Sequence, residues 1–117
     1  MQTLFTLLLA AGALLTKLMP GNNDQLIIGK WQNIENPKLI HTYTAETRYE
    51  MLGADTLGMV NYYLYGAEKD SMSVGMAKYE HRFGIAFPAK DRLQVKYLNP
   101  PSGYTGQLQW EFKRLGK

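Results

Sequence analysis

Side chains after Gly21 alternate between apolar and polar at every second position, and this period constrains the fold more than any other feature. The segment 92–97 shows it most clearly, because Leu93, Val95 and Tyr97 alternate there with charged and amide residues. A period of two is the side-chain repeat of a β-strand, which turns successive residues to opposite faces of a sheet. The region is therefore expected to consist of strands that each have one apolar face.

Turn-forming residues divide this region into roughly six to eight short strands. Residues 53–55, 66–70 and 99–103 are rich in Gly, Pro, Asn and Asp, which favour turns. The strands are expected at 26–34, 39–51, 57–65, 71–77, 79–87, 93–97 and 108–112, with 39–51 forming one strand or two joined by a bulge. No amphipathic helix period follows Pro20. We therefore expect an all-β fold, a small antiparallel up-and-down barrel.

The first 19 residues differ from the rest, because residues 4–15 are apolar apart from Thr6. Their length fits the hydrophobic region of a cleaved signal peptide. The alternative is an uncleaved membrane anchor, a hydrophobic helix of about 18 residues that just crosses a bilayer. We therefore divide the chain into a signal peptide or anchor at 1–19, a linker at 20–24 and a barrel domain at 25–117. The domain is expected to be exported, periplasmic or extracellular, or else attached to a membrane through residues 2–19 and facing the outside.

Composition disfavours several classes of function. The chain has no cysteine and two histidines, His41 and His81, and no compact spacing of metal ligands occurs. Most carboxylates fall on polar faces, among them Glu46, Glu50, Glu80 and Glu111. Acid–base catalysis by a carboxylate pair needs two of them in one cleft. The net charge of +3 is scattered rather than gathered in a stripe that would bind nucleic acid. We expect no enzyme, no cofactor, no metal site and no nucleic-acid partner.

Three short motifs resemble those of lipocalins and of small bacterial lipocalin-like domains. Gly29-Lys30-Trp31 is similar to the Gly-x-Trp signature of the first strand, and the chain ends in Trp110 to Leu115 as such domains often do. The turn Asp91-Arg92-Leu93 resembles their repeated hairpins. The resemblance implies that Trp31 closes one end of the barrel while Arg114 of the last strand lies across its ring. Such a cation–π pair is structural and contributes roughly 1–2 kcal/mol.

Several side chains on the expected inner faces are candidate ligand contacts. Tyrosine hydroxyls there would orient an apolar ligand. The alternative is that these side chains simply fill the interior, since a barrel of about eight strands is barely wider than its own side chains. His41 and His81 both fall on inner faces, where a histidine is either a ligand contact or a pH-sensitive group. We expect the alternative, an ordinary histidine hydrogen-bonded to a backbone carbonyl. The candidates are Tyr43, Tyr49, Tyr79, His81 and Tyr97.

Two functions remain open at this point. The first is a non-enzymatic, exported, lipocalin-like binding module with a small hydrophobic ligand in the mouth of the barrel. The second is an exported or membrane-tethered accessory subunit that binds a protein partner through the outer face or an edge of the barrel. The segment 57–65 supports the second function, because it is apolar on both of its faces.

Overall fold

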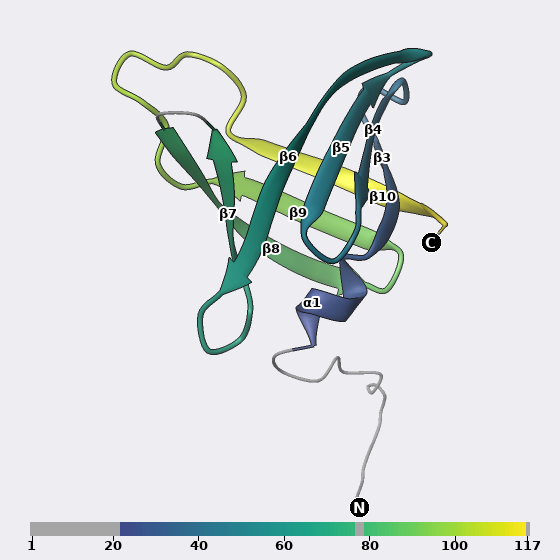
Figure 1. Cartoon of the computed structure of the whole chain (residues 1–117), viewed down its shortest axis with the longest axis horizontal. Coiled ribbons are helices and arrows are strands. Elements are labelled where there is room, and N and C mark those ends of the chain that lie inside the picture. The colour runs from purple at the N-terminus through teal and green to yellow at the C-terminus, as the bar shows by residue number, and fades with distance from the viewer. Residues whose placement is uncertain (1–21, 77–78, 117) are drawn as a thin grey trace, which may run out of the picture.

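The computed structural model describes residues 22–76 and 79–116, which form one short helix and eight β-strands (Figure 1). In chain order the elements are α1 (Asn23–Leu26), β3 (Gly29–Asn33), β4 (Leu39–Tyr43), β5 (Thr47–Leu52), β6 (Asp55–Tyr65), β7 (Ser71–Met76), β8 (Tyr79–Ala89), β9 (Arg92–Tyr97) and β10 (Gln109–Gly116). Apart from residues 44–46 and 77–78, the connections between these strands contain Gly, Asn or Asp.

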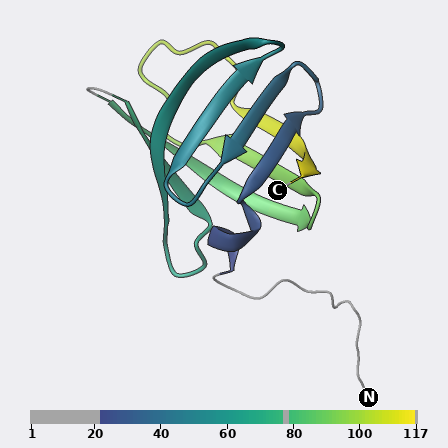
Figure 2. The same ribbon diagram turned by 45° about the vertical axis from the view of Figure 1, so that its right-hand side comes forward.

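The strands form a closed antiparallel barrel in which each strand pairs with the next one along the chain. β10 pairs with β9 on one side and with β3 on the other, which closes the sheet. Figure 2 shows the strands as a curved wall with α1 at its lower end. The predicted all-β, antiparallel, up-and-down barrel is therefore confirmed, with eight strands.

The chain enters the barrel through a helix, which corrects the strand predicted at 26–34. Asn23 to Leu26 are helical, so the described end of the predicted linker also belongs to α1. The strand begins only at Gly29, whose φ of 131° is a conformation that residues with a Cβ rarely adopt. A helix of one turn is too short to produce a helical period in the sequence, so the pattern gave no sign of it.

The segment predicted at 39–51 as one strand, or two joined by a bulge, is a tight hairpin of two strands. β4 ends at Tyr43, and the turn before β5 is held by backbone and hydroxyl hydrogen bonds between Thr44 and Thr47. The turn consists of residues 44–46, and across it Tyr43 pairs with Arg48 and His41 pairs with Glu50. Odd-numbered residues of β4 and even-numbered residues of β5 therefore share the inner face. Tyr49, which the sequence placed inside, is consequently on the outer surface and 39% exposed.

The two apolar faces of β6 are also resolved. Tyr62 is buried, and Val60 and Leu64 pack against the core, so the even-numbered residues face inward. Met59 and Tyr63 are each 58% exposed on the outside. β6 pairs with β7 from Tyr62 to Tyr65, while the preceding residues of β6 pair with β5 on their other side.

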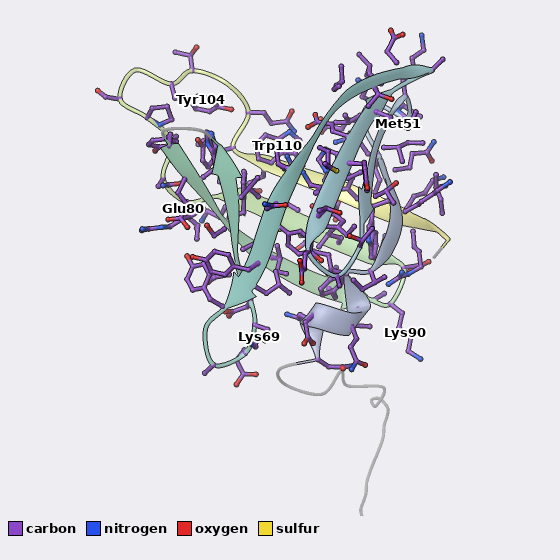
Figure 3. The ribbon with its side chains drawn as sticks, viewed as in Figure 1. Met51, Lys69, Glu80, Lys90, Tyr104 and Trp110 are labelled. Atoms are coloured by element: carbon purple, nitrogen blue, oxygen red, sulfur yellow. The ribbon has the colours of Figure 1, made fainter. Side chains whose placement is uncertain are left out.

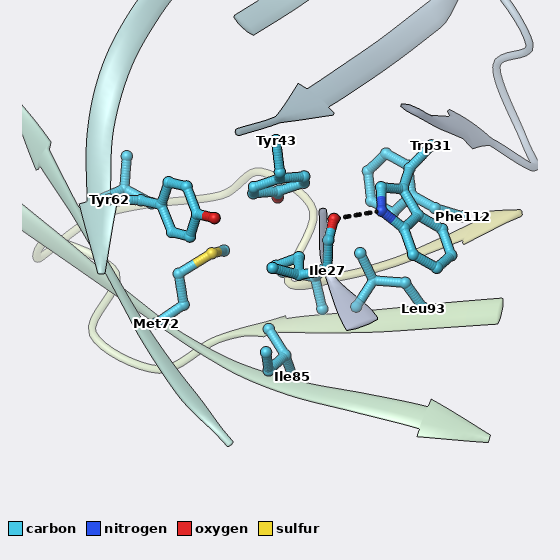
Figure 4. Close-up of a cluster of buried hydrophobic side chains, with 10 residues drawn as sticks. Ile27, Trp31, Tyr43, Tyr62, Met72, Ile85, Leu93 and Phe112 are labelled. Carbon is cyan, nitrogen blue, oxygen red and sulfur yellow. Dashed lines mark hydrogen bonds between the residues drawn. The ribbon is translucent and has the colours of Figure 1, made fainter. Parts of the chain in front are cut away.

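The core fills the end of the barrel that α1 covers. Ile27, directly after the helix, is fully buried among inward-facing side chains of the strands (Figure 4). The Trp31 indole N–H donates a hydrogen bond of 2.8 Å to the Ile27 carbonyl. The other buried members of this cluster are Tyr43, Tyr62, Met72, Val74, Ile85, Leu93, Val95 and Phe112.

The predicted signal peptide or anchor at 1–19, with its hydrophobic helix, lies outside the described residues. Within residues 22–76 and 79–116, no helix has the length and apolar character needed to cross a membrane.

Candidate functional site

The covered end of the barrel brings together the pair that the resemblance implied. The Arg114 guanidinium carbon lies 4.3 Å from the centroid of the Trp31 ring. Arg114 also donates hydrogen bonds to the carbonyls of Leu26, Ile28 and Lys90. Together with the indole N–H on Ile27, these bonds satisfy three successive carbonyls at the end of α1, which a helix terminus leaves free. Both side chains therefore hold the helix in the barrel end.

The opposite end of the barrel is hollow. An inner cavity of about 160 Å³ is lined by Leu39, His41, Tyr43, Arg48, Glu50, Phe83, Val95, Trp110 and Phe112. A mouth cavity of about 310 Å³ lies beside it, under the loop between β9 and β10, and is lined by Arg48, Val74, His81, Phe83, Tyr97, Pro101, Tyr104 and Trp110. Three residues border both cavities, so the two are adjoining parts of one interior. Figure 3 shows Tyr104 on that loop and Trp110 among the strands.

Of the five predicted ligand contacts, the structure brings three together at the mouth. His81 and Tyr97 line the mouth cavity, and the Tyr97 hydroxyl is hydrogen-bonded to the His81 ring. Tyr79 stands at the rim, where it packs edge-on against His81 and donates a hydrogen bond to the Asn99 carbonyl. Tyr43 lines the inner cavity instead, and Tyr49 lies outside the barrel.

The walls of the mouth cavity are mostly aromatic. The Phe83 ring stacks on Tyr97 with centroids 5.0 Å apart, and it meets the Trp110 ring edge-on at 6.2 Å. Tyr104 of the loop packs edge-on against Tyr97 at 5.3 Å. Such a lining suits a flat or apolar ligand, for which aromatic rings supply large contact areas.

A polar cluster lies deeper, in the inner cavity. The Glu50 carboxylate is 3.7 Å from His41 Nε2 and 3.6 Å from an Arg48 terminal nitrogen. This corrects the prediction that Glu50 lies on an outward polar face. The cause is the hairpin turn at 44–46, which places the even-numbered residues of β5 inside the barrel.

Burial and neighbouring charges shift the titration of this cluster. Burial lowers the pKa of His41 below its ordinary value of 6.5, so that the ring is neutral at pH 7. The neighbouring His41 lowers the pKa of the Glu50 carboxyl, which therefore stays ionised. Burial raises the pKa of the Tyr43 hydroxyl, which keeps its proton.

Several buried polar atoms of the cluster have no hydrogen-bond partner among the residues that the structure describes. They are both ring nitrogens of His41, the Tyr43 hydroxyl and Arg48 Nε. The prediction that His41 is hydrogen-bonded to a backbone carbonyl is therefore wrong, since neither ring nitrogen has such a partner among the described residues. A buried polar group without a partner costs about 1–3 kcal/mol, and native proteins contain few of them.

Sequence reasoning missed Arg48 and Glu50. Their positions depend on the length of the turn between β4 and β5, since a shift of one residue exchanges the two faces of a strand. The usable signal was Thr44-Ala45-Glu46-Thr47, in which a Thr hydroxyl accepts a hydrogen bond from a backbone N–H and so favours a turn over a continuous strand.

A second hollow lies on the outer surface, across β8, β9 and β10. Its volume is about 590 Å³, larger than either interior cavity. Outward residues such as Gly84, Ala86, Gln94 and Lys96 line it, and all of its polar side chains face solvent. It lacks the buried polar atoms of the interior, which makes the interior the stronger candidate. Within the described part of the chain, no group of three or more His, Cys, Asp or Glu side chains is placed to hold a metal ion.

No protein-family model, curated protein or solved structure significantly matches this chain.

Proposed function

We propose that this protein is an exported, lipocalin-like binding module that holds a small, largely apolar molecule in the open end of its barrel. One observation carries the proposal: His41, Tyr43 and Arg48, which hold buried polar atoms without a hydrogen-bond partner among the described residues, line a cavity that adjoins an aromatic mouth. Ligand sites in proteins commonly combine an apolar lining with a few polar groups that fix orientation. Export is supported by the apolar segment at 1–19.

The likeness to lipocalins supports the same proposal. Those proteins are also closed antiparallel barrels, and in barrels of about eight strands a single small ligand fits the interior. The Gly-x-Trp motif and Arg114 close one end here, which leaves the other end for a ligand to enter.

A neutral fluorescent dye, N-phenyl-1-naphthylamine, tests the proposal, because its emission rises in apolar surroundings. We expect saturable binding at one site. Val74→Phe, which fills part of the mouth cavity, should weaken binding by about tenfold. Lys96→Phe, which alters the outer hollow, is the matched control and should leave binding unchanged.

Two results would contradict a site inside the barrel. One is the absence of saturable dye binding by the wild-type protein. The other is a loss of binding in Lys96→Phe together with normal binding in Val74→Phe, which would move the site to the outer hollow. Thermal unfolding of both variants shows whether each is folded at the assay temperature.

A second candidate function is protein binding through the outer face of β5 and β6. Four large apolar or aromatic side chains are exposed there, at fractions between 39% and 58% (Tyr49, Leu57, Met59 and Tyr63). Tyr and Met are enriched in the cores of protein interfaces. Sedimentation velocity tests whether a second copy covers this face: we expect concentration-dependent dimers that Met59→Lys removes. A monomer at every concentration would contradict self-association.

A further inference from the structure

Arg48 is the one arginine that borders both interior cavities. Its side chain is 14% exposed, and its ion pair with Glu50, at 3.6 Å, is longer than a hydrogen bond. Its Nε has no hydrogen-bond partner among the described residues. A guanidinium binds planar anions through two parallel N–H bonds, and these are stronger than bonds between neutral groups. An anionic ligand would therefore supply the acceptors that the chain does not.

The charges of the inner cluster decide what such an anion needs. Arg48 and Glu50 balance each other, and His41 is neutral at pH 7 because burial lowers its pKa. A bound carboxylate would leave one negative charge uncompensated in a cluster that is largely shielded from solvent, where unpaired charges are costly. One additional positive charge would restore neutrality.

His41 is the group able to provide that charge. Glu50 and Arg48 face it from β5, Tyr43 lies on its own strand, and its neighbours Trp31 on β3 and Phe112 on β10 do not titrate. A nearby carboxylate favours the protonated imidazole. Protonated His41 would then pair with Glu50, 3.7 Å away, and release Arg48 for the ligand.

We propose that the barrel ligand is an organic acid, bound as its anion with the carboxylate on Arg48 while His41 takes up one proton. The inference rests on the proposed function, since it needs a ligand inside the barrel. The apolar body of the acid would lie in the mouth cavity against Phe83, Trp110 and Tyr104.

Displacement of N-phenyl-1-naphthylamine by decanoic acid and by decan-1-ol tests the ligand class. The two competitors share one apolar chain and differ in the head group. At pH 7 we expect decanoate to bind at least about tenfold more tightly than decanol, as one charge-assisted hydrogen bond allows. Equal affinities would overturn the inference while leaving the proposed function intact. Failure of the dye itself to bind would instead count against the proposed function.

Replacement of the arginine tests where the carboxylate binds. Arg48→Met keeps the apolar stem of the side chain. In this variant the affinities for decanoate and decanol should become about equal, while the dye still binds. Arg82→Met, on the outer face of β8, is the matched control and should keep the preference. A preference that survives in Arg48→Met would overturn the assignment. If Arg48→Met does not fold, the competition and proton measurements on the wild-type protein decide the question.

Proton uptake tests the role of His41 in a way that a structural role would not reproduce. Calorimetry in two buffers of different ionisation enthalpy should show that decanoate binding takes up as much as about one proton. Its affinity should rise as the pH falls from about 8 to about 6, whereas decanol affinity should not change. His41→Gln should abolish the uptake, whereas Arg82→Met, on the outer face of β8, should keep it. An affinity for decanoate that is independent of pH would overturn the proposed proton uptake.

Discussion

Arg114 shows how one residue joins three elements of this barrel. Its guanidinium covers the Trp31 ring and donates to carbonyls at the end of α1 and at Lys90, in the turn between β8 and β9. The helix has four residues, too few to be stable alone, so its place depends on these contacts. Within the described residues, the Gly-x-Trp motif and Arg114 therefore act as one structural unit.

Loss of this guanidinium should destabilise the fold. Arg114→Met leaves three carbonyls without their donor, and we expect the free energy of unfolding in urea to fall by roughly 2–3 kcal/mol. Lys113→Met, the exposed neighbour on β10, should change it by less than about 0.5 kcal/mol. Equal effects of the two substitutions would show that the contacts of Arg114 contribute little.

His41 should make the stability of the unliganded protein depend on pH. Its pKa is lowered in the folded state, so below about pH 6.5 the unfolded chain binds more protons than the folded one. The free energy of unfolding should therefore decrease as the pH falls from about 7.5 to 5.5. His81 has a lowered pKa as well and adds to the same trend. Urea unfolding of His41→Gln should show a smaller decrease than the wild type, and an identical decrease would contradict the prediction.

At the scale of elements, junctions decide which residues face the interior. The turn between β4 and β5 moves Tyr49 outside and brings Arg48 and Glu50 inside. The junction between α1 and β3 needs a backbone conformation that Gly29 adopts with φ of 131°. Each junction involves only a few residues, yet each sets the orientation of a whole strand.

Substitution at the helix–strand junction tests this dependence. Gly29→Ala places a Cβ on a residue with positive φ, and we expect a loss of about 1–3 kcal/mol in the free energy of unfolding. Gly58→Ala is the matched control, because a Cβ there would meet nothing within 4 Å and the φ is not positive. If Gly29→Ala is no more destabilising than Gly58→Ala, the junction is not strained by a side chain.

At the scale of the whole molecule, the two ends of the barrel differ. One end is filled by α1 and the buried cluster, and the other holds the two cavities beneath the loop that carries Tyr104. The seam between β10 and β3 closes the sheet near the filled end. The pairing of β6 with β7 covers four positions, beginning at Tyr62.

Hydrogen exchange should reveal this difference. Among the residues that the structure describes, the amides of residues 55–61 of β6 that point away from β5 have no partner on β7. They should exchange at least about tenfold faster than those of the β10–β3 seam. Within β6, the exchange rates should be compared between successive backbone amides, because one points toward β5 and the next points away from it. Equal protection of both regions would mean that the described barrel is uniformly stable.

The sequence by itself determined the fold class, because a period of two over most of the chain requires strands, and its turn residues mark nearly every hairpin. It also indicated the inner faces of β8, β9 and β10, where the alternation is unbroken. Only the tertiary structure decided the helix at 23–26, the inner face of β6 and the inward turn of Arg48 and Glu50. The physical reason is that alternation fixes which residues share a face within a strand, whereas turn length and long-range pairing decide which face meets the core.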